Sequence, residues 1–133
     1  MVRVVIDTNV LVSALIDDGK PRRLLTKLLQ EHTVIASRRM LAELADVLTR
    51  DKFAVKSSQV DRFLSSLLKK SKIVPDTPRF KIILEDPDDD KVLDTAYTEK
   101  ADYIVTGDRH LLTLKTFKGT KIRNVTQMLE ILS

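Results

Sequence analysis

Residues 2–7, VRVVID, and residues 103–108, YIVTGD, share one pattern, a short apolar run rich in β-branched residues that leads to an aspartate. Such runs are typical of buried β-strands. In a parallel sheet the strands end at a common edge, which is where ligands bind. We therefore expect Asp7 and Asp108 to lie near each other at that edge. Either aspartate alone also has a simpler interpretation, as the N-cap of the helix that follows it.

Further short apolar runs alternate with amphipathic segments along the chain. Strands are predicted over Val2–Ile6, Thr33–Ala36, Lys72–Pro75, Tyr103–Thr106 and Lys121–Arg123. Helices are predicted around Leu24–Leu29, Met40–Leu48, Val60–Leu68, Asp90–Lys100 and Thr126–Leu132. This alternation favours an α/β sandwich around a mostly parallel sheet of about four to five strands. No repeat or linker is visible, so we expect residues 1–133 to form a single domain.

Composition excludes several classes of protein. The 133 residues are 43% hydrophobic and 32% charged, with 3 Gly and 4 Pro, which suits a folded domain with its own core. The absence of cysteine excludes disulfide frameworks, thiolate nucleophiles and zinc–thiolate sites. No apolar run reaches the roughly 18 residues of a membrane span, and the first residues do not resemble a signal peptide. We therefore expect a cytoplasmic protein.

The net charge of +4 conceals a strong asymmetry along the chain. The segment 85–108 holds nine acids and two bases, a net charge of −7, which leaves +11 for the remaining residues. Aspartate is common at turns and helix starts, and this accounts for part of the acidic segment. A basic body around an acidic centre also suits a protein that attracts a polyanion to a metal-binding site.

Glu43 lies at the edge of the apolar arc of its predicted helix, whereas Asp46 points further out. A carboxylate at the boundary of a core is costly unless it has a partner. That partner is either an arginine or lysine side chain, or a metal ion shared with other acids. The sequence leaves both alternatives open.

The run DPDDD at residues 86–90 precedes the helix over Asp90–Lys100, where one or two acids satisfy the helix dipole. Asp94 follows Asp90 by one helical turn, so the two share a face. This helix is expected to bury four residues, Val92, Leu93, Ala96 and Tyr97. Two unit charges about 4 Å apart repel by roughly 4 kcal/mol at an effective dielectric of about 20. Converging carboxylates therefore need a cation, and oxygen ligands suit Mg²⁺ or Mn²⁺.

Four blocks of the sequence resemble those of the PIN domain family: VVIDTNVLVSAL, LAELADVL, DPDDDKVLDTA and YIVTGDRHLL. A lone DTN is a weak signal, whereas four blocks in order with suitable spacing are specific. The resemblance covers nearly the whole chain and is strongest to VapC-like toxin components and their DPDDD-bearing relatives in archaea and bacteria. It implies a three-layer α/β/α fold with a central parallel sheet, one PIN-like nuclease domain over residues 1–133, and a metal-dependent ribonuclease activity.

The resemblance also implies which residues form the site. The four acids that it assigns as metal ligands and catalytic residues are Asp7, Glu43, Asp90 and Asp108. Asp90 is chosen as the third because its separation from the last acid is the usual one in the family, and Asp88 and Asp89 are the alternatives. Asn9 and Thr106 are expected to donate or accept hydrogen bonds that orient these acids.

Basic residues near the predicted acids are candidates for holding the phosphates of a substrate. They are Arg38, Arg39 and Arg109. We interpret most other basic residues as ordinary solvated surface. His110 is expected to lie in the first turn of a helix, and His32 at a helix end, near its carbonyls.

The leading hypothesis is a Mg²⁺- or Mn²⁺-dependent endoribonuclease that hydrolyses RNA phosphodiester bonds by metal-activated water, leaving 5′-phosphate and 3′-hydroxyl ends. By the resemblance it is the toxin of a type II toxin–antitoxin system, with a cognate antitoxin as partner and a homodimer as its assembly. The main alternative is a catalytically silent RNA- or protein-binding module. A metal-free ribonuclease using His32 with His110 is a third hypothesis. A phospho-accepting receiver domain lacks support because no paired acid follows the first strand.

Overall fold

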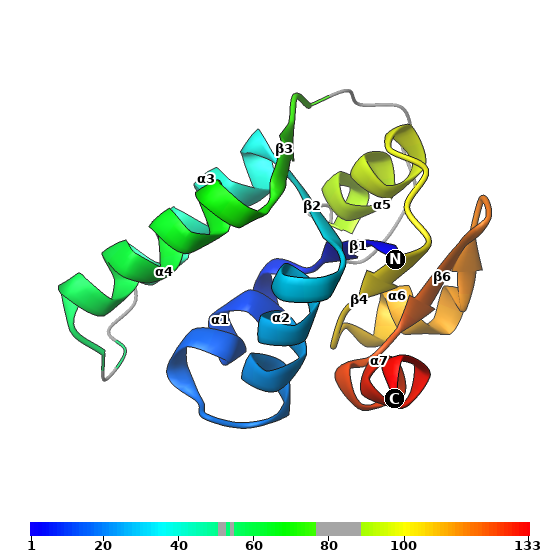
Figure 1. Ribbon diagram of the computed structural model, residues 1–133. Helices are drawn as coiled ribbons and strands as arrows, with labels where there is room; N and C mark the ends of the chain where they lie inside the picture. The colour runs from blue at the N-terminus through cyan, green and yellow to red at the C-terminus, as the bar shows by residue number, and fades with distance from the viewer. Residues whose placement is uncertain (51–52, 54, 77–88) are drawn as a thin grey trace.

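The computed structural model describes residues 1–50, 53, 55–76 and 89–133, with residues 89 and 90 described by their backbone alone. In this part of the chain six strands form one sheet in the order β3-β2-β1-β4-β6-β5 (Figure 1). The strands are β1 (Arg3–Ile6), β2 (Thr33–Ser37), β3 (Lys72–Val74), β4 (Tyr103–Val105), β5 (Thr116–Phe117) and β6 (Thr120–Arg123). The α/β fold with a mostly parallel sheet is confirmed.

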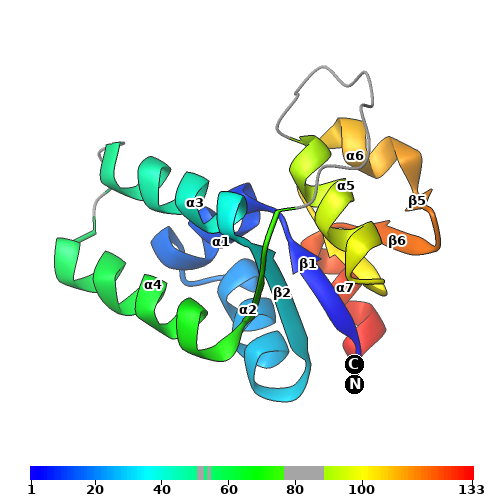
Figure 2. The ribbon, with the colours of Figure 1, turned by 90° about the horizontal axis from the view of Figure 1, so that it is seen from above.

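Seven helices occur in the described residues. They are α1 (Thr8–Ile16), α2 (Lys20–Glu31), α3 (Arg38–Arg50), α4 (Ser57–Lys70), α5 (Asp89–Thr98), α6 (Arg109–Leu114) and α7 (Val125–Leu132). Helices α3 and α4 lie side by side and extend away from the sheet (Figures 1 and 2). None of the helices in the described residues is both long and apolar enough to cross a bilayer.

The two faces of the sheet are covered by different helices because side chains alternate along each strand. Val4 and Ile6 of β1 join a core formed with α1, α2, α4 and α7 and with most of the buried face of α3. Val5 lies on the opposite face, where it packs with Ile104 of β4 in a second core that α5 and α6 complete. The result is the three-layer arrangement that the family resemblance implies.

The five strands predicted from the sequence are all present, and their mutual pairings are parallel. The sixth, β5, was not predicted and pairs antiparallel with β6. The connecting turn holds Lys118 and Gly119 at positive φ, 49° and 90°. A two-residue turn with this backbone matches the twist of a hairpin. Two residues of strand are too few for an alternating pattern to show in the sequence.

Helix α5 differs most from the prediction. Val92, Leu93 and Ala96 are buried as expected, but Tyr97 is 42% exposed. The whole run from Lys91 to Ala96 is buried. The reason is that α5 packs against both the sheet and α3, so its first turns are covered on several sides. Helical periodicity identifies one buried face and does not predict that a second element covers the polar one.

Candidate functional site

The parallel strands end at one edge of the sheet, and the predicted acids follow those ends. Asp7 comes directly after β1, and Asp108 is the third residue after β4. Strands β1 and β4 are neighbours in the sheet, although about a hundred residues separate them in sequence. Strands β2 and β3 lie on one side of β1 in the sheet, and the chain then crosses over to form β4 on the other side of β1. The two aspartates therefore lie at the switch point of the sheet, where open α/β sheets form ligand crevices.

Thr106 connects the two aspartates. Its side chain is fully buried, and its hydroxyl Oγ1 donates to Asp7 Oδ2 at 2.7 Å. The same oxygen accepts a hydrogen bond from the backbone N–H of Asp108 at 3.0 Å. The hydroxyl is thus used in both directions, as donor and as acceptor. This arrangement fixes one oxygen of Asp7 and the start of the Asp108 loop relative to each other.

The simple capping interpretation applies to one aspartate and not to the other. Asp108 is the N-cap of α6, where its Oδ1 accepts from the backbone N–H of His110 at 2.8 Å. Asp7 occupies the N-cap position of α1, yet its carboxylate makes no side-chain capping bond to that helix. Asp7 therefore sits at a helix start with its carboxylate held by the Thr106 hydroxyl and by the backbone of Thr8, the first residue of α1.

Asp7 is 8% exposed, and its environment favours the protonated form. Burial raises the pKa of its carboxyl above the ordinary value. Hydrogen bonds from the Thr106 hydroxyl and the Thr8 backbone lower that pKa in part, whereas the negative charges of Asp108 and Glu43 raise it further. The three acids are therefore close enough to interact electrostatically. Such a concentration of negative charge is a recognised mark of a functional site.

Glu43 is positioned at the boundary of the core, as its helical phase predicts. It lies on α3 with its side chain 29% exposed, one residue before the fully buried Leu44. Asp46, by contrast, is exposed and pairs with Arg50 at 3.2 Å. The partner of Glu43 is the Lys91 ammonium of α5, which forms an ion pair and hydrogen bond with Glu43 Oε2. Glu43 thus has a basic partner in the structure, and its part in a metal site shared with other acids stays a prediction.

The third predicted acid cannot be placed as a side chain. Asp90 lies in the first turn of α5, but its side chain is outside the described residues, as is that of Asp89, while Asp88 is outside altogether. Among the side chains that the structure describes, no three of the types His, Cys, Asp and Glu are grouped so as to hold a metal ion. The assignment of Asp90 as a ligand stays a prediction.

The remaining site predictions concern exposed residues near this edge. Asn9 is exposed, and in the described part of the chain no hydrogen bond joins its side chain to one of the acids. Arg38 and Arg39 are exposed in the first turn of α3, directly after β2, and Arg109 is exposed at the start of α6. The backbone N–H of Arg39 donates to the Asp76 carboxylate at 3.2 and 3.3 Å. The three arginines are therefore accessible on the side where the acids lie.

The two histidines lie at opposite ends of the sheet. His32 precedes β2, and its Nδ1 accepts a hydrogen bond from the backbone N–H of Val2, just before β1. His32 is also the C-cap of α2, where its backbone N–H donates to the Leu28 carbonyl at 2.9 Å, so its expected place at a helix end is confirmed. His110 lies in the first turn of α6, beyond the carboxyl end of β4. The two imidazoles are not brought together, so the metal-free mechanism that pairs them has no structural basis.

Sequence analysis missed two buried charged residues of α5. Lys91 is 9% exposed and Asp94 is 7% exposed. The available signal was the position of Lys91 next to the DPDDD run, where a base is surrounded by acids. It was not decisive, because a lysine beside acids is most often part of a solvated surface.

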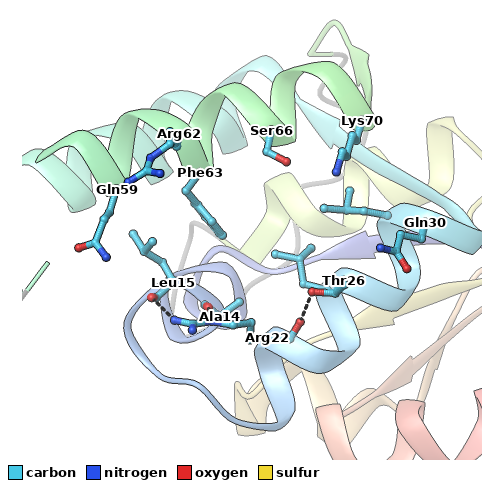
Figure 3. Close-up of a pocket in the computed structure, with 12 residues that line it drawn as sticks. Ala14, Leu15, Arg22, Thr26, Gln30, Gln59, Arg62, Phe63, Ser66 and Lys70 are labelled. Carbon is cyan, nitrogen blue, oxygen red and sulfur yellow. Dashed lines mark hydrogen bonds between the residues drawn. The ribbon is translucent and has the colours of Figure 1, made fainter. Parts of the chain in front are cut away.

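A separate cleft lies between α4 and the α1–α2 pair, away from the acids (Figure 3). It has a volume of about 450 Å³. Phe63 points into it from α4, and Leu15 faces it from the end of α1. The Arg22 guanidinium at its floor is held by the carbonyls of Ala14 and Leu15, at 2.9 and 2.7 Å. None of the predicted site residues lines this cleft.

The Thr106 hydroxyl offers a direct test of the link between the two aspartates. Replacing Thr106 with valine keeps the shape of the side chain and removes both hydrogen bonds. We expect the free energy of unfolding at pH 7 to fall by about 1–3 kcal/mol, the usual cost when a buried charged group loses its partner. Urea denaturation measures the change. Thr113→Val is the control, since Thr113 is exposed and its hydroxyl donates to the Arg109 carbonyl within α6, at 2.6 Å. Equal losses in both variants would contradict the link.

Comparisons with known proteins bear on the family and the fold. The family model described as PIN domain matches residues 3–110. An uncharacterized protein of Methanocaldococcus jannaschii, MJ1680, is 32% identical over 130 residues, which cover 93% of this chain and 83% of the relative.

Two crystal structures share the fold. One is VapBC2 from Rickettsia felis bound to a DNA fragment from its promoter, with a TM-score of 0.66, 20% identity, and coverage of 92% of this chain and 98% of that one. The other is PAE2754 from Pyrobaculum aerophilum, with a TM-score of 0.65, 19% identity, and coverage of 98% and 89%. Sequence match, fold and the placement of the acids at the switch point agree: the chain belongs to the PIN domain family.

Proposed function

We propose that this protein is a Mg²⁺- or Mn²⁺-dependent endoribonuclease and the toxin component of a type II toxin–antitoxin system. PIN domains are in general nucleases that use divalent metal ions. The observation that carries the proposal for this chain is the buried Asp7, held by Thr106 at the switch point of the sheet. Its pKa is raised by burial and by the charges of Asp108 and Glu43. Such a cluster is unfavourable until a cation joins it.

The donor chemistry fits a hard divalent cation. The candidate ligands Asp7, Glu43, Asp90 and Asp108 offer only carboxylate oxygens, and neither histidine interrupts the set. A bound Mg²⁺ or Mn²⁺ supplies an activated water and stabilises the charge that develops on the phosphate. In this proposal Thr106 keeps one Asp7 oxygen in place, and the cap of α6 keeps one Asp108 oxygen in place.

The substrate is proposed to be RNA held along its phosphate backbone. Arg38, Arg39 and Arg109 are exposed at the starts of α3 and α6, on the edge where the acids lie. Guanidinium groups pair well with phosphate oxygens. Only 5% of the residues are aromatic, and there is no tryptophan, so stacking of bases is a minor contribution. Contacts of this kind hold the backbone without reading a sequence.

The proposed physiological partners are a cognate antitoxin and a second copy of the chain. Support for the antitoxin comes from the similar Rickettsia felis structure, which is a VapBC complex on promoter DNA. For the homodimer, support comes from α4, which has a strongly exposed apolar residue, Leu68, at 57%. A reading frame next to the gene that encodes a small DNA-binding protein would support the toxin assignment, provided that its product inhibits cleavage.

Chelation tests the proposed activity. Purified protein is incubated with labelled RNA in Mg²⁺ or Mn²⁺, with and without EDTA. We expect cleavage in either metal, none in EDTA, and recovery when excess metal is restored. The products should carry 5′-phosphate and 3′-hydroxyl ends. Full cleavage in EDTA, or cyclic phosphate ends, would reject the metal mechanism. RNA retention in a shift assay without cleavage in any divalent ion would favour the catalytically silent binding module.

A further inference from the structure

The Lys91 ammonium is buried inside the acidic end of the molecule. The residue is 9% exposed, and its Nζ is bound to Glu43 Oε2, across the contact between α5 and α3. The backbone carbonyl of Lys91 accepts a hydrogen bond from the Thr95 hydroxyl at 2.8 Å. The charged end of the side chain therefore reaches the same Glu43 whose negative charge raises the pKa of Asp7.

A buried lysine of this kind is unusual. Lysine is almost never buried without a charged partner, because removing the ammonium from water is costly. The other lysine–glutamate pair in the described residues illustrates the ordinary case. Lys72 pairs with Glu99 at 3.1 Å at the opposite edge of the sheet, with the lysine side chain 50% exposed. Burial of Lys91 against Glu43 thus places a fixed positive charge among acids that are proposed to bind a metal.

We propose that Lys91 is a positioning residue that acts as a built-in counter-cation of the acidic site. Its ammonium holds Glu43 when no metal ion is bound and competes with the ion for that carboxylate. The inference rests on the proposed function to the extent that it takes Glu43 as a metal ligand. It goes further by assigning a role to a residue that the ligand prediction does not include.

Two consequences follow from this role. First, the apo protein can bring Glu43 towards Asp7 and Asp108 without unfolding, because one of the negative charges is already balanced. Second, the positive charge of the ammonium repels a divalent ion that binds beside it. The affinity of the site for metal is therefore lower than it would be without Lys91. Removing the charge should therefore weaken the apo protein and strengthen metal binding. A lysine that only packs the α3–α5 contact would produce the first effect without the second.

The experiment compares Mn²⁺ binding by calorimetry, and the thermal midpoint with and without Mn²⁺, in Lys91→Met and the wild type. Methionine keeps the length of the side chain and removes the charge. We expect Lys91→Met to bind Mn²⁺ about tenfold more tightly or better. Its midpoint in EDTA should fall below that of the wild type, and Mn²⁺ should raise it by more.

Two further variants make the readout specific. Lys91→Arg keeps a positive charge, and its Kd for Mn²⁺ should stay within about threefold of the wild-type value. Lys72→Met removes the lysine of the remote, exposed pair and should leave the Kd unchanged. If Lys91→Met does not fold in EDTA, Glu43→Gln combined with Lys91→Met should fold, since neither charge is then left without its partner. Failure of that double variant to fold would show a packing role and overturn the proposal.

An unchanged Kd for Mn²⁺ in folded Lys91→Met, or absence of Mn²⁺ binding in both proteins, would also overturn it. The outcome is independent of RNA cleavage. If the wild type binds Mn²⁺ and Lys91→Met binds it more tightly, the inference holds even where no RNA is cut, and only the proposed ribonuclease activity fails. If the wild type cleaves RNA but Lys91→Met binds Mn²⁺ no more tightly than the wild type, the proposed ribonuclease activity stands and the inference about Lys91 fails.

Discussion

Asp7→Asn is expected to lower RNA cleavage by about 10³-fold or more, because it neutralises an acid of the site that is only 8% exposed. Asparagine has nearly the same shape and can still accept the hydrogen bond from Thr106 through its amide oxygen. The loss therefore reports the carboxylate charge and leaves the local geometry in place. Single-turnover cleavage of labelled RNA in Mn²⁺ measures it.

The same substitution is expected to stabilise the metal-free protein at pH 7. Since the pKa of Asp7 is raised in the folded state, the folded protein keeps its proton to a higher pH than the unfolded chain does. Stability therefore falls as the pH rises from the unfolded pKa, near 3.8, through the folded one. An uncharged asparagine avoids this loss. In EDTA the thermal midpoint of Asp7→Asn should exceed that of the wild type at pH 7, and the gain should shrink in acid.

The control for Asp7 is Asp17, which ends the helix that Asp7 begins. Asp17 is exposed, and it is the C-cap of α1 through its backbone N–H, which donates to the Ser13 carbonyl at 3.0 Å. Asp17→Asn should retain full cleavage and the wild-type midpoint. Cleavage by Asp7→Asn within about tenfold of the wild type would contradict the assignment of Asp7.

Leu44→Ala is expected to lower the free energy of unfolding by about 3 kcal/mol, within the range of about 2–5 for buried leucines. Leu44 is fully buried on α3 and packs in the core that includes Val4 and Val105. Its loss removes contacts of the helix that carries Glu43, so we also expect weaker metal binding. Urea denaturation gives the free energy, and calorimetry with Mn²⁺ gives the affinity.

Leu68→Ala is the matched control on α4. Leu68 is 57% exposed, so the same substitution should change the free energy of unfolding by less than about 0.5 kcal/mol. A similar loss in both variants would mean that the buried face of α3 is not where the structure places it.

The parts of the molecule that were predictable are those with a strong local pattern. The β-branched runs predict the strands β1 and β4. Polar residues that follow such runs lie at the carboxyl edge of a parallel sheet. Glu43 was placed at the core boundary because it lies close in helical phase to Val47, at the edge of the apolar arc, and Leu44 and Leu48 of that arc are both buried. Serine is a common residue just before a helix, and the hydroxyl of Ser37, which precedes α3, accepts from the Met40 backbone N–H at 3.2 Å.

The parts that were not predictable depend on contacts between distant segments. Burial of Lys91 and exposure of Tyr97 follow from how α5 fits between α3 and the sheet, which the period of one helix does not encode. The lysine partner of Glu43 likewise depends on the α3–α5 contact, which the sequence does not show. The aspartates at 88–90 are consecutive in the sequence, so the sequence alone does not decide which of them is the third ligand.

The location of a bound metal ion tests the central claim most directly. Crystals of the wild-type protein are soaked in Mn²⁺, and its position is found by anomalous diffraction. We predict a peak at the carboxyl edge of the sheet, about 2.0–2.3 Å from carboxylate oxygens of Asp7 and Asp108, with one of the aspartates 88–90 completing the acidic set. A peak elsewhere, or no peak at this edge in saturating Mn²⁺, would contradict it.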